Sequence, residues 1–320
     1  MHSTGVMRWT LPLLLVAGCA LDEHVTSVEE PLVCANPLIC PGNSDLLALL
    51  GVFELNTDLL TDNARGFHMT SIEHDGVNVP TFQVPGAKIH EVDANGYVHD
   101  GAGAIGTVIR VHHTPSNQDF DLKIINYITV PFYDPTVIPK IIGYDIIYRK
   151  VGDRDWLPLC PFEEVKSDDG IAATWAVFWK GDRYDPDTGV ITASGGVVGS
   201  WFNISCAGEA WVKVERAQRG GAVAPFSPVP SRQTTLWMFT ATYCTPGIRH
   251  THLGMPLDWK DPWEPRNYGG GATPEAVWDA NGATCLGNPR FEWPGATECP
   301  KLGLCTPAQF ALGSVVSANP

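Results

Sequence analysis

The chain has 320 residues, of which 35 are Asp or Glu and 21 are Lys or Arg, and its formal net charge at pH 7 is −14. Nucleic-acid binding needs clustered positive charge, so this balance argues against a nucleic-acid partner and against electrostatic attachment to anionic lipid. Hydrophobic residues make up 44% of the chain, which is enough for a sizeable core in one large domain or two modest ones.

Residues 1–18 have the form of a leader peptide. The apolar run 9–17 is too short to cross a bilayer and fits the hydrophobic region of a signal peptide. It leads into Val-Ala-Gly-Cys, which resembles a bacterial lipobox and predicts a lipid on Cys19; the alternative is an ordinary secretory signal that contains a cysteine. Ala20 favours the outer membrane over inner-membrane retention in a Gram-negative cell. We therefore expect an outer-membrane lipoprotein, facing the periplasm or the cell exterior, with its lipid as the membrane contact.

Residues 19–43 are polar and contain proline, which is typical of a tether between the lipid and a folded domain. Beyond Cys19 the chain has an even number of cysteines, and in an exported protein these predict up to four disulfides. The candidates are Cys34, Cys40, Cys160, Cys206, Cys244, Cys285, Cys299 and Cys305.

The spacing of the cysteines suggests how they pair. Cys34 and Cys40 are six residues apart, and Cys299 and Cys305 repeat that spacing near the other end of the chain. We expect each of these pairs to close a local loop, so that the other four cysteines pair among themselves. A metal site built from cysteines is less favoured, because no CxxC pair of the zinc-ribbon type occurs.

Residues 44–206 have the pattern of a β-rich part. Apolar and polar residues alternate at 120–124, 144–148 and 175–179, and Phe202, Ile204 and Cys206 fall on one side of a further strand. Glycine and aspartate punctuate these runs as turn residues do. Short strands separated in this way predict a sandwich or a barrel.

Two of the turns carry alternating oxygen side chains, Asp93 with Asn95 and Asp185 with Asp187. This spacing matches the beginning of a calcium-binding loop, but neither turn continues to the distal glutamate of an EF-hand. A plain turn is the favoured interpretation of both, with calcium as the alternative.

From residue 207 to residue 291 the periodicity becomes partly helical. Residues 210–217 predict a short helix, and Ser231 is a candidate cap for a second helix that directs Leu236, Phe239 and Tyr243 inward, although its threonines leave a strand possible. Thr273 and Pro274 resemble the start of a third helix. The remaining segment, 292–320, is rich in Gly and Pro, and we expect it to be held only by its own cysteine pair. The predicted class is therefore α+β, with a β-rich part followed by a smaller helix-containing part stapled by disulfides.

The stretch from Phe239 to Asp261 is the densest in reactive side chains. Cys244 could be a nucleophile with His250 as its base and Asp258 or Asp261 as the group that orients the imidazole, but an exported thiol more often forms a disulfide. His250 and His252 form an HxH pair, which could hold zinc with Asp258 as a third ligand. Two histidines in a polar loop are more often simply hydrogen bonded.

Aromatic residues in and beside the same stretch allow a second interpretation. Tyr243, Trp259 and Trp263 could line a surface for a glycan or peptide, or they could fill a small core.

This stretch also carries a family resemblance. Ala-Thr-Tyr-Cys at 241–244, followed by Gly247, His250-Thr251, Gly254, Pro256, Asp258 and Asp261, resembles the ADYC domain family of myxobacterial exported proteins. Further family blocks occur in order at 156–160, 202–208, 275–278 and 282–286, so the resemblance covers roughly residues 105–291. The family has no settled biochemical function, and the resemblance therefore implies no activity.

The chain departs from the family pattern at a few positions. Thr242 stands where the family name places Asp, and Val214 and a residue near Thr235 stand where many members carry two more cysteines. The departure at Thr242 weakens any mechanism that would depend on that Asp, and the joint loss of two cysteines implies one missing disulfide.

We therefore expect a noncatalytic binding or surface-structural module of the cell envelope, with an envelope or extracellular protein or glycan as the ligand. The alternative is a hydrolase of an envelope or extracellular polymer that uses His250 with Asp258 or Asp261, with or without a metal. The sequence contains no GxSxG, HExxH, P-loop or dinucleotide motif that would favour an enzyme. No cofactor is expected, with zinc or calcium as the alternatives.

Overall fold

The computed structural model describes most of the chain from Glu54 to Asn319, and all of these residues belong to one unit, Leu32–Pro320. The described ranges are 54–130, 132–133, 141–160, 162–166, 172–185, 187–193, 200–207, 209–217, 227–251, 257–260, 273–290, 299–312 and 315–319, with only the backbone at 162–166 and 172–173. The leader, the tether and the Cys34 and Cys40 pair lie outside them.

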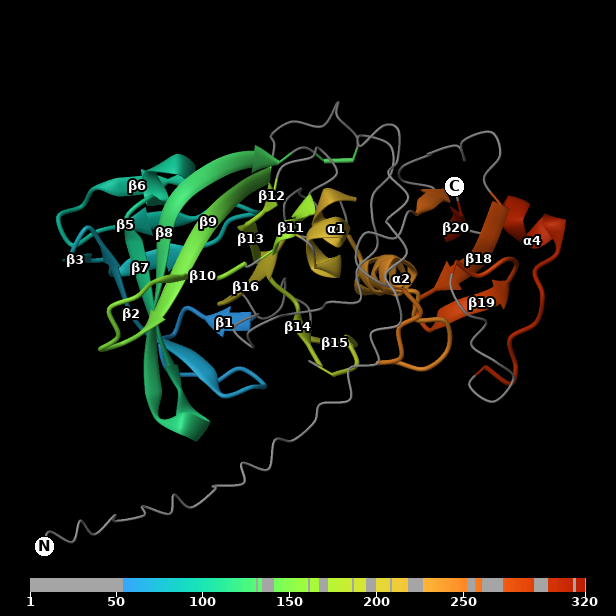
Figure 1. The fold of residues 1–320 in the computed structure, drawn as a ribbon, viewed down its shortest axis with the longest axis horizontal. Helices are drawn as coiled ribbons and strands as arrows, with labels where there is room; N and C mark the ends of the chain where they lie inside the picture. Colours follow the sequence, from blue (N-terminus) through green and yellow to red (C-terminus); the bar gives the residue numbers. More distant parts are fainter. Residues whose placement is uncertain are drawn as a thin grey trace, which may run out of the picture. The chain divides into compact units, whose positions relative to one another are not determined.

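A nine-stranded antiparallel sheet is the largest element (Figure 1). Its order is β1-β16-β13-β9-β8-β7-β2-β3, and β10 also pairs with β9. Its strands are β1 (Glu54–Asn56), β2 (Phe67–His74), β3 (Val77–Asn78), β7 (Thr107–His113), β8 (Gln118–Val130), β9 (Ile141–Lys150), β10 (Leu157–Pro158), β13 (Trp175–Lys180) and β16 (Trp201–Cys206). All four strands expected from alternation are present, in β8, β9, β13 and β16.

Strand β13 shows how the sheet is covered on both sides. Trp175, Val177 and Trp179 belong to one core cluster, whereas Ala176 and Phe178 belong to another. Because successive side chains of a strand point to opposite faces, these two clusters lie on the two faces of the sheet. The alternation of apolar and polar residues expected at 175–179 is wrong, because this part of the sheet is buried on both faces and the strand is therefore a continuous apolar run.

The first face is covered by a small sheet of β4 (Thr81–Gln83), β5 (His90–Val92) and β6 (Val98–Asp100), with the 3-10 turn η1 (Gly101–Ala104) after it. Phe82 and Ile89 of this region pack with Leu55, Met69 and Phe202 of the large sheet. Short elements complete this part of the chain: η2 (Thr114–Ser116), the pair β11 (Phe162–Lys166) and β12 (Ala172–Ala173), and the pair β14 (Arg183–Tyr184) and β15 (Ile191–Ala193).

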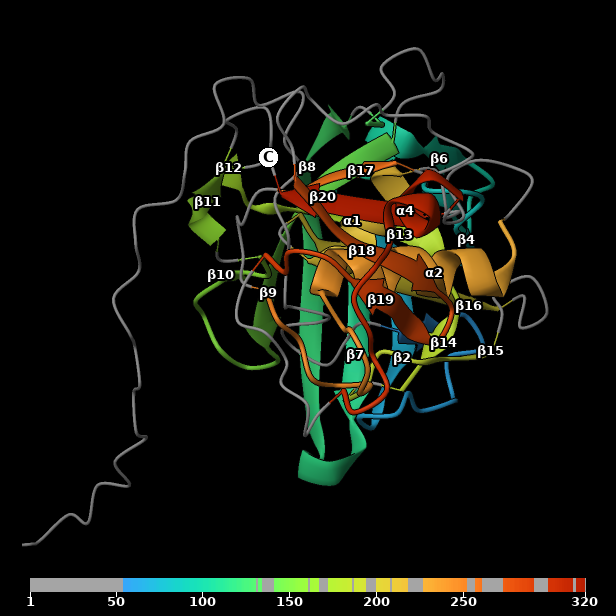
Figure 2. The same ribbon diagram turned by 90° about the vertical axis from the view of Figure 1, so that its right-hand side faces the viewer.

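The second face is covered by helices α1 (Ala210–Arg216) and α2 (Val229–Thr240), which lie between the large sheet and the C-terminal strands (Figure 1, Figure 2). The α1 helix is the one expected at 210–217. The expected cap at Ser231 is wrong, because α2 begins two residues earlier, at Val229. Pro228 is the N-cap, and Pro230 lies in the first turn, where a missing N–H costs nothing.

A four-stranded sheet of order β17-β20-β18-β19 completes the C-terminal part. Helix α4 (Pro307–Leu312) comes directly before its last strand in the sequence. Its strands are β17 (Asp258–Lys260), β18 (Thr273–Asp279), β19 (Gly282–Leu286) and β20 (Val315–Asn319). The third helix expected from Thr273 and Pro274 is therefore wrong. Short apolar runs buried on all sides do not distinguish strand from helix, and the proline sits at an irregularity of the strand register, where it is tolerated.

The last segment of the chain is an integral part of this sheet. Strand β20 lies between β17 and β18, and Val316 and Ala318 are fully buried in it. The expectation that 292–320 is held only by its own cysteines is thus wrong, because backbone pairing with two strands holds it. The predicted α+β class is confirmed, and among the residues that the structure describes no helix has the length and hydrophobicity to cross a membrane.

Three disulfides join the described cysteines: Cys160–Cys206, Cys244–Cys299 and Cys285–Cys305. The first joins two of the four cysteines expected to pair among themselves. The expected local loop between Cys299 and Cys305 is wrong. Cys305 N–H donates to the Leu286 carbonyl at 2.7 Å, which places Cys305 beside Cys285 and leaves Cys299 to Cys244.

The pairing predicts a definite outcome for peptide mapping. A digest of the unreduced protein should contain the Cys244 peptide linked to the Cys299 peptide, and a Cys299–Cys305 loop would contradict the fold. Because Cys244–Cys299 closes a loop of 55 residues, the double variant Cys244→Ser with Cys299→Ser should lose about 4 kcal/mol of unfolding free energy in urea titration.

Candidate functional site

Helix α2 ends at the first residue of the Ala-Thr-Tyr-Cys motif. Ala241 is the C-cap, with a φ of 48° in the left-handed region that usually favours glycine. Its side chain is fully buried in the core, so the methyl group offsets part of the conformational cost. Thr242, which replaces Asp of the family name, is also buried and shares a 2.8 Å hydrogen bond with the Thr240 hydroxyl.

Tyr243 lies at the centre of a buried polar cluster. Its hydroxyl donates to Glu275 Oε1 at 2.5 Å, and Arg290 donates to both oxygens of Glu275, at 2.6 Å from Nε and 2.5 Å from Nη2. The Glu275 and Arg290 side chains are 0% and 1% exposed. Burial, and then the charge of Glu275, raise the pKa of Tyr243. For Arg290, burial acts to lower the pKa of the guanidinium, but the charge of Glu275 outweighs burial and the pKa is raised. The tyrosine is therefore a neutral donor.

Other motif residues pack around this cluster. The Trp278 ring stacks on Tyr243 with centroids 5.3 Å apart, and the Tyr243 carbonyl accepts a hydrogen bond from Ala283 N. Gly282 has a φ of +122°, and a Cβ there would lie 2.4 Å from the Tyr243 carbonyl oxygen. These contacts are internal to the C-terminal part, so these motif residues stabilise its fold.

The residues expected to carry chemistry in this stretch are placed as follows. Cys244 is bound in its disulfide with Cys299, which leaves no thiol for a nucleophile. The His250 ring lies beside the Tyr243 ring at 5.3 Å, and Asp258 is in β17, where its carboxylate accepts a hydrogen bond from its neighbour's backbone N–H. Trp259 and Tyr243 are fully buried and fill the core. His252, Asp261 and Trp263 lie outside the described residues.

The two turns considered for calcium use their carboxylates internally. Asp93 Oδ1 accepts from the backbone of Asn95 and Tyr97, and Asp185 Oδ1 accepts from the backbone of Asp187 and Thr188. Both are turns of the Asx type. Within the described ranges, no three His, Cys, Asp or Glu side chains are grouped so as to hold a metal.

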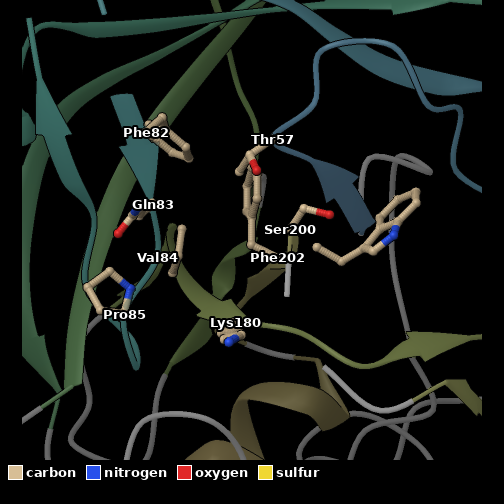
Figure 3. A pocket seen from close by; sticks show the side chains of 9 residues that line it. Thr57, Phe82, Gln83, Val84, Pro85, Lys180, Ser200 and Phe202 are labelled. Carbon is tan, nitrogen blue, oxygen red and sulfur yellow. The ribbon is translucent and has the colours of Figure 1, made fainter. Parts of the chain in front are cut away.

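A cavity of about 420 Å³ opens between the two layers of the N-terminal part (Figure 3). Its volume is in the range of about 300–1,000 Å³ typical of small-molecule sites. One wall comes from β4 and the residues after it, and the other comes from the ends of β1, β13 and β16. The lining residues are Thr57, Phe82, Gln83, Val84, Pro85, Lys180, Ser200, Trp201 and Phe202.

The cavity lies over buried aromatic residues and has one cation among its described lining residues. Phe82 and Phe202 are buried with ring centroids 5.4 Å apart, and the Trp201 ring is held under the Arg183 guanidinium at 3.9 Å. The accessible lining comes from Thr57, Gln83, Pro85, Lys180 and Ser200. Lys180 is the only charged residue of the described lining.

Comparison with known proteins identifies the family but no characterised relative. The model of the ADYC domain matches residues 101–292, which is more than half of the chain. The chain belongs to the ADYC domain family. Neither the curated proteins nor the solved structures include a match. The cavity spans the boundary of the ADYC domain, since Lys180, Trp201 and Phe202 lie inside it whereas Thr57 and Phe82 precede it.

The structure also shows a buried acid that motif analysis of the ADYC protein missed. Glu91 of β5 is fully buried and accepts a hydrogen bond from the Thr107 hydroxyl at 2.9 Å, and His74 Nδ1 lies 3.4 Å from its carboxylate. His74 stacks on His99, which contacts Asp93. The residues that line the cavity carry no sequence motif. The histidine cluster does have a sequence signal, because six of the ten histidines fall between residues 68 and 113.

Burial shifts the protonation of this chain of groups. Desolvation raises the pKa of Glu91 from 4.5 to about 7, opposed by the Thr107 hydrogen bond. Burial, and then the neighbouring His99, lower the pKa of His74. Both shifts favour the neutral forms. Because the folded-state pKa of Glu91 is raised, its contribution to stability is complete below about pH 4.5 and is lost as the pH rises through about 7.

The variant Glu91→Gln isolates this effect, since it is neutral at every pH. We expect the wild type to lose about 2–3 kcal/mol of unfolding free energy relative to Glu91→Gln between pH 5 and pH 8. The His74 shift acts in the opposite direction at acid pH and is present in both proteins. Urea titrations at four pH values measure the difference, and parallel pH curves for the two proteins would contradict it.

Proposed function

We propose that the ADYC protein is an outer-membrane lipoprotein whose folded part is a noncatalytic binding module. The observation that carries the proposal is the cavity beside Lys180. It would take a small ligand with an anionic group, which pairs with Lys180, and a body that lies against the exposed Gln83 and Pro85. The ligand would come from the envelope or the surroundings of the cell.

Two features support binding over catalysis. The described lining residues include no histidine, carboxylate or thiol, which are the groups that most often serve as a general base or an activated nucleophile at neutral pH. The one cysteine that could have served as a nucleophile in the Ala-Thr-Tyr-Cys motif is bound in a disulfide. A preformed cavity with a single charge in its described lining is suited to recognising a ligand and releasing it unchanged.

The cavity predicts how a simple probe should bind. The aromatic sulfonate 8-anilino-1-naphthalenesulfonate should bind the wild type with one site, and Lys180→Met should weaken binding at least about tenfold, because a charged contact contributes about 1.5–3 kcal/mol. Fluorescence titration gives both constants. The matched control is Lys150→Met, which removes an exposed lysine at the end of β9 and should bind as the wild type does.

Circular dichroism and thermal unfolding establish that each variant is folded. Equal affinities of the wild type and Lys180→Met would contradict the assignment of this cavity.

The lipoprotein part of the proposal rests on the lipobox and has its own test. Cys19→Ser should move the chain from the outer-membrane fraction to the soluble fraction and remove the mass of the lipid from the mature protein. A wild type that carries no lipid, or a Cys19→Ser variant that stays in the membrane, would contradict it. Fractionation followed by intact mass spectrometry decides between these outcomes.

A further inference from the structure

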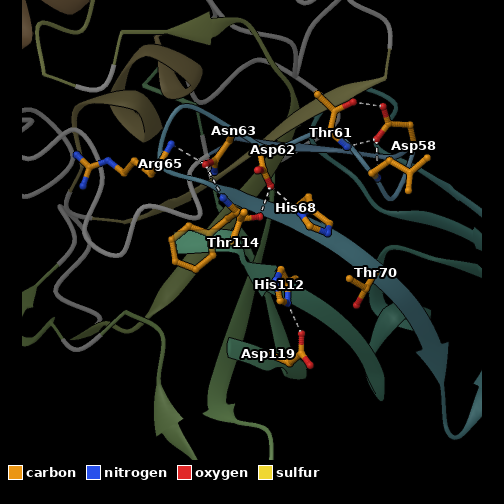
Figure 4. Close-up of polar contacts among 12 residues, drawn as sticks. Asp58, Thr61, Asp62, Asn63, Arg65, His68, Thr70, His112, Thr114 and Asp119 are labelled. Carbon is orange, nitrogen blue, oxygen red and sulfur yellow. Dashed lines mark hydrogen bonds and ion pairs between the residues drawn. The ribbon is translucent and has the colours of Figure 1, made fainter. Parts of the chain in front are cut away.

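Two histidines stand side by side on the outer face of the large sheet (Figure 4). His68 of β2 pairs directly with His112 of β7, and their ring centroids are 5.3 Å apart. The next pair in this register, Met69 and Val111, is fully buried in the core on the opposite face. The imidazoles therefore point away from the core, and their side chains are 18% and 23% exposed.

Each imidazole is held by a carboxylate through Nδ1. His68 Nδ1 lies 2.6 Å from Asp62 Oδ1, and His112 Nδ1 lies 2.8 Å from Asp119 Oδ1. Asp62 is fixed in turn by the Thr114 hydroxyl at 3.0 Å, and Asp119 is the direct partner of His112 across β7 and β8.

A carboxylate on Nδ1 has a known consequence for an imidazole. It fixes the tautomer that carries the proton on Nδ1, and it leaves the lone pair on Nε2 for an external ligand. Metal-binding histidines are oriented in this way by carboxylates of the surrounding protein. Here two such histidines are adjacent, and each has a carboxylate behind it.

The spacing of the rings matches a shared ion. Zn–N bonds are about 2.0–2.1 Å long, and two imidazoles that bind one tetrahedral ion through Nε2 have ring centroids about 5.2 Å apart. The observed separation is 5.3 Å. The two rings are therefore close enough to bind one ion together.

We propose that His68 and His112 form a binding site for one divalent transition-metal ion, of which zinc is the best fit, with Asp62 and Asp119 as positioning residues. The site supplies two protein ligands, and the described part of the chain brings no third His, Cys, Asp or Glu into the set. Water completes the coordination, which makes the ion exchangeable and open to a further ligand. The site lies on β2 and β7, on different elements from the cavity of the proposed function.

Zinc titration of the untagged full chain at neutral pH tests the site. Calorimetry should give one zinc per chain. His68→Gln and His112→Gln should each weaken binding at least about tenfold, and Asp62→Asn and Asp119→Asn should weaken it about 10- to 100-fold, as is typical when a carboxylate behind a metal ligand is removed.

The matched control is His90→Gln. His90 has the same Nδ1 contact with a carboxylate, Asp100 Oδ1 at 2.5 Å, but it belongs to the covering sheet and not to the His68–His112 pair. This variant should bind zinc as the wild type does. Cobalt gives an independent readout, since tetrahedral cobalt has intense visible absorption bands that should be present in the wild type and absent in His112→Gln.

Several outcomes would overturn the site. One is a folded His68→Gln variant that binds zinc with the affinity of the wild type. Another is a His250→Gln variant that loses zinc binding while His68→Gln keeps it, which would assign the metal to the HxH pair. Asp119 is exposed on the sheet surface, so Asp119→Asn keeps the test decisive if a histidine variant does not fold. Unchanged zinc affinity in Asp119→Asn would remove the positioning role.

Discussion

A buried ion pair between Asp182 and Arg232 holds the ADYC helices against the large sheet. Arg232 of α2 donates to both carboxylate oxygens of Asp182 at 2.6 and 2.7 Å, and the two side chains are 2% and 1% exposed. Removal of one partner from such a pair costs about 3–5 kcal/mol, because the other charge stays buried. The two residues that follow Asp182 both donate hydrogen bonds to the Glu54 carboxylate of β1, Arg183 from its side chain and Tyr184 from its backbone N–H. The end of β13 is thus fixed between a helix and the edge strand, and this positions Lys180 and Trp201 in the cavity.

The placement of the cavity has a consequence for the family. The ADYC domain supplies Lys180 and one wall of the cavity, whereas the segment before residue 101 supplies the other wall. His68 and Glu91 also precede the domain. The cluster of Tyr243, Glu275 and Arg290 that underlies the family motif is buried and stabilises the C-terminal sheet. Under the proposed function, the ligand preference would therefore depend in part on the segment that precedes the domain.

Much of the fold could be predicted because strand alternation is a local property. The four strands expected in the β-rich part and helix α1 are present, since period-two and helical patterns report directly on which side chains are buried. The errors concern nonlocal pairing. Strand β18 was expected to be a helix because a proline after threonine is a local helix signal, whereas its pairing with β20 depends on residues some forty positions later. The spacing of Cys299 and Cys305 predicts a local loop, whereas Cys305 pairs with Cys285 of β19 and Cys299 pairs with Cys244, which follows α2. The cavity is formed by residues that carry no motif, and so it became visible only in three dimensions.

The most direct test of the binding role is a crystal structure of the protein soaked with 8-anilino-1-naphthalenesulfonate. The account predicts that the sulfonate lies within salt-bridge distance of Lys180 Nζ and that the rings lie against Pro85, with the disulfides and the ion pair of Asp182 unchanged. Density for the probe only at other surfaces, with an empty cavity, would contradict the account.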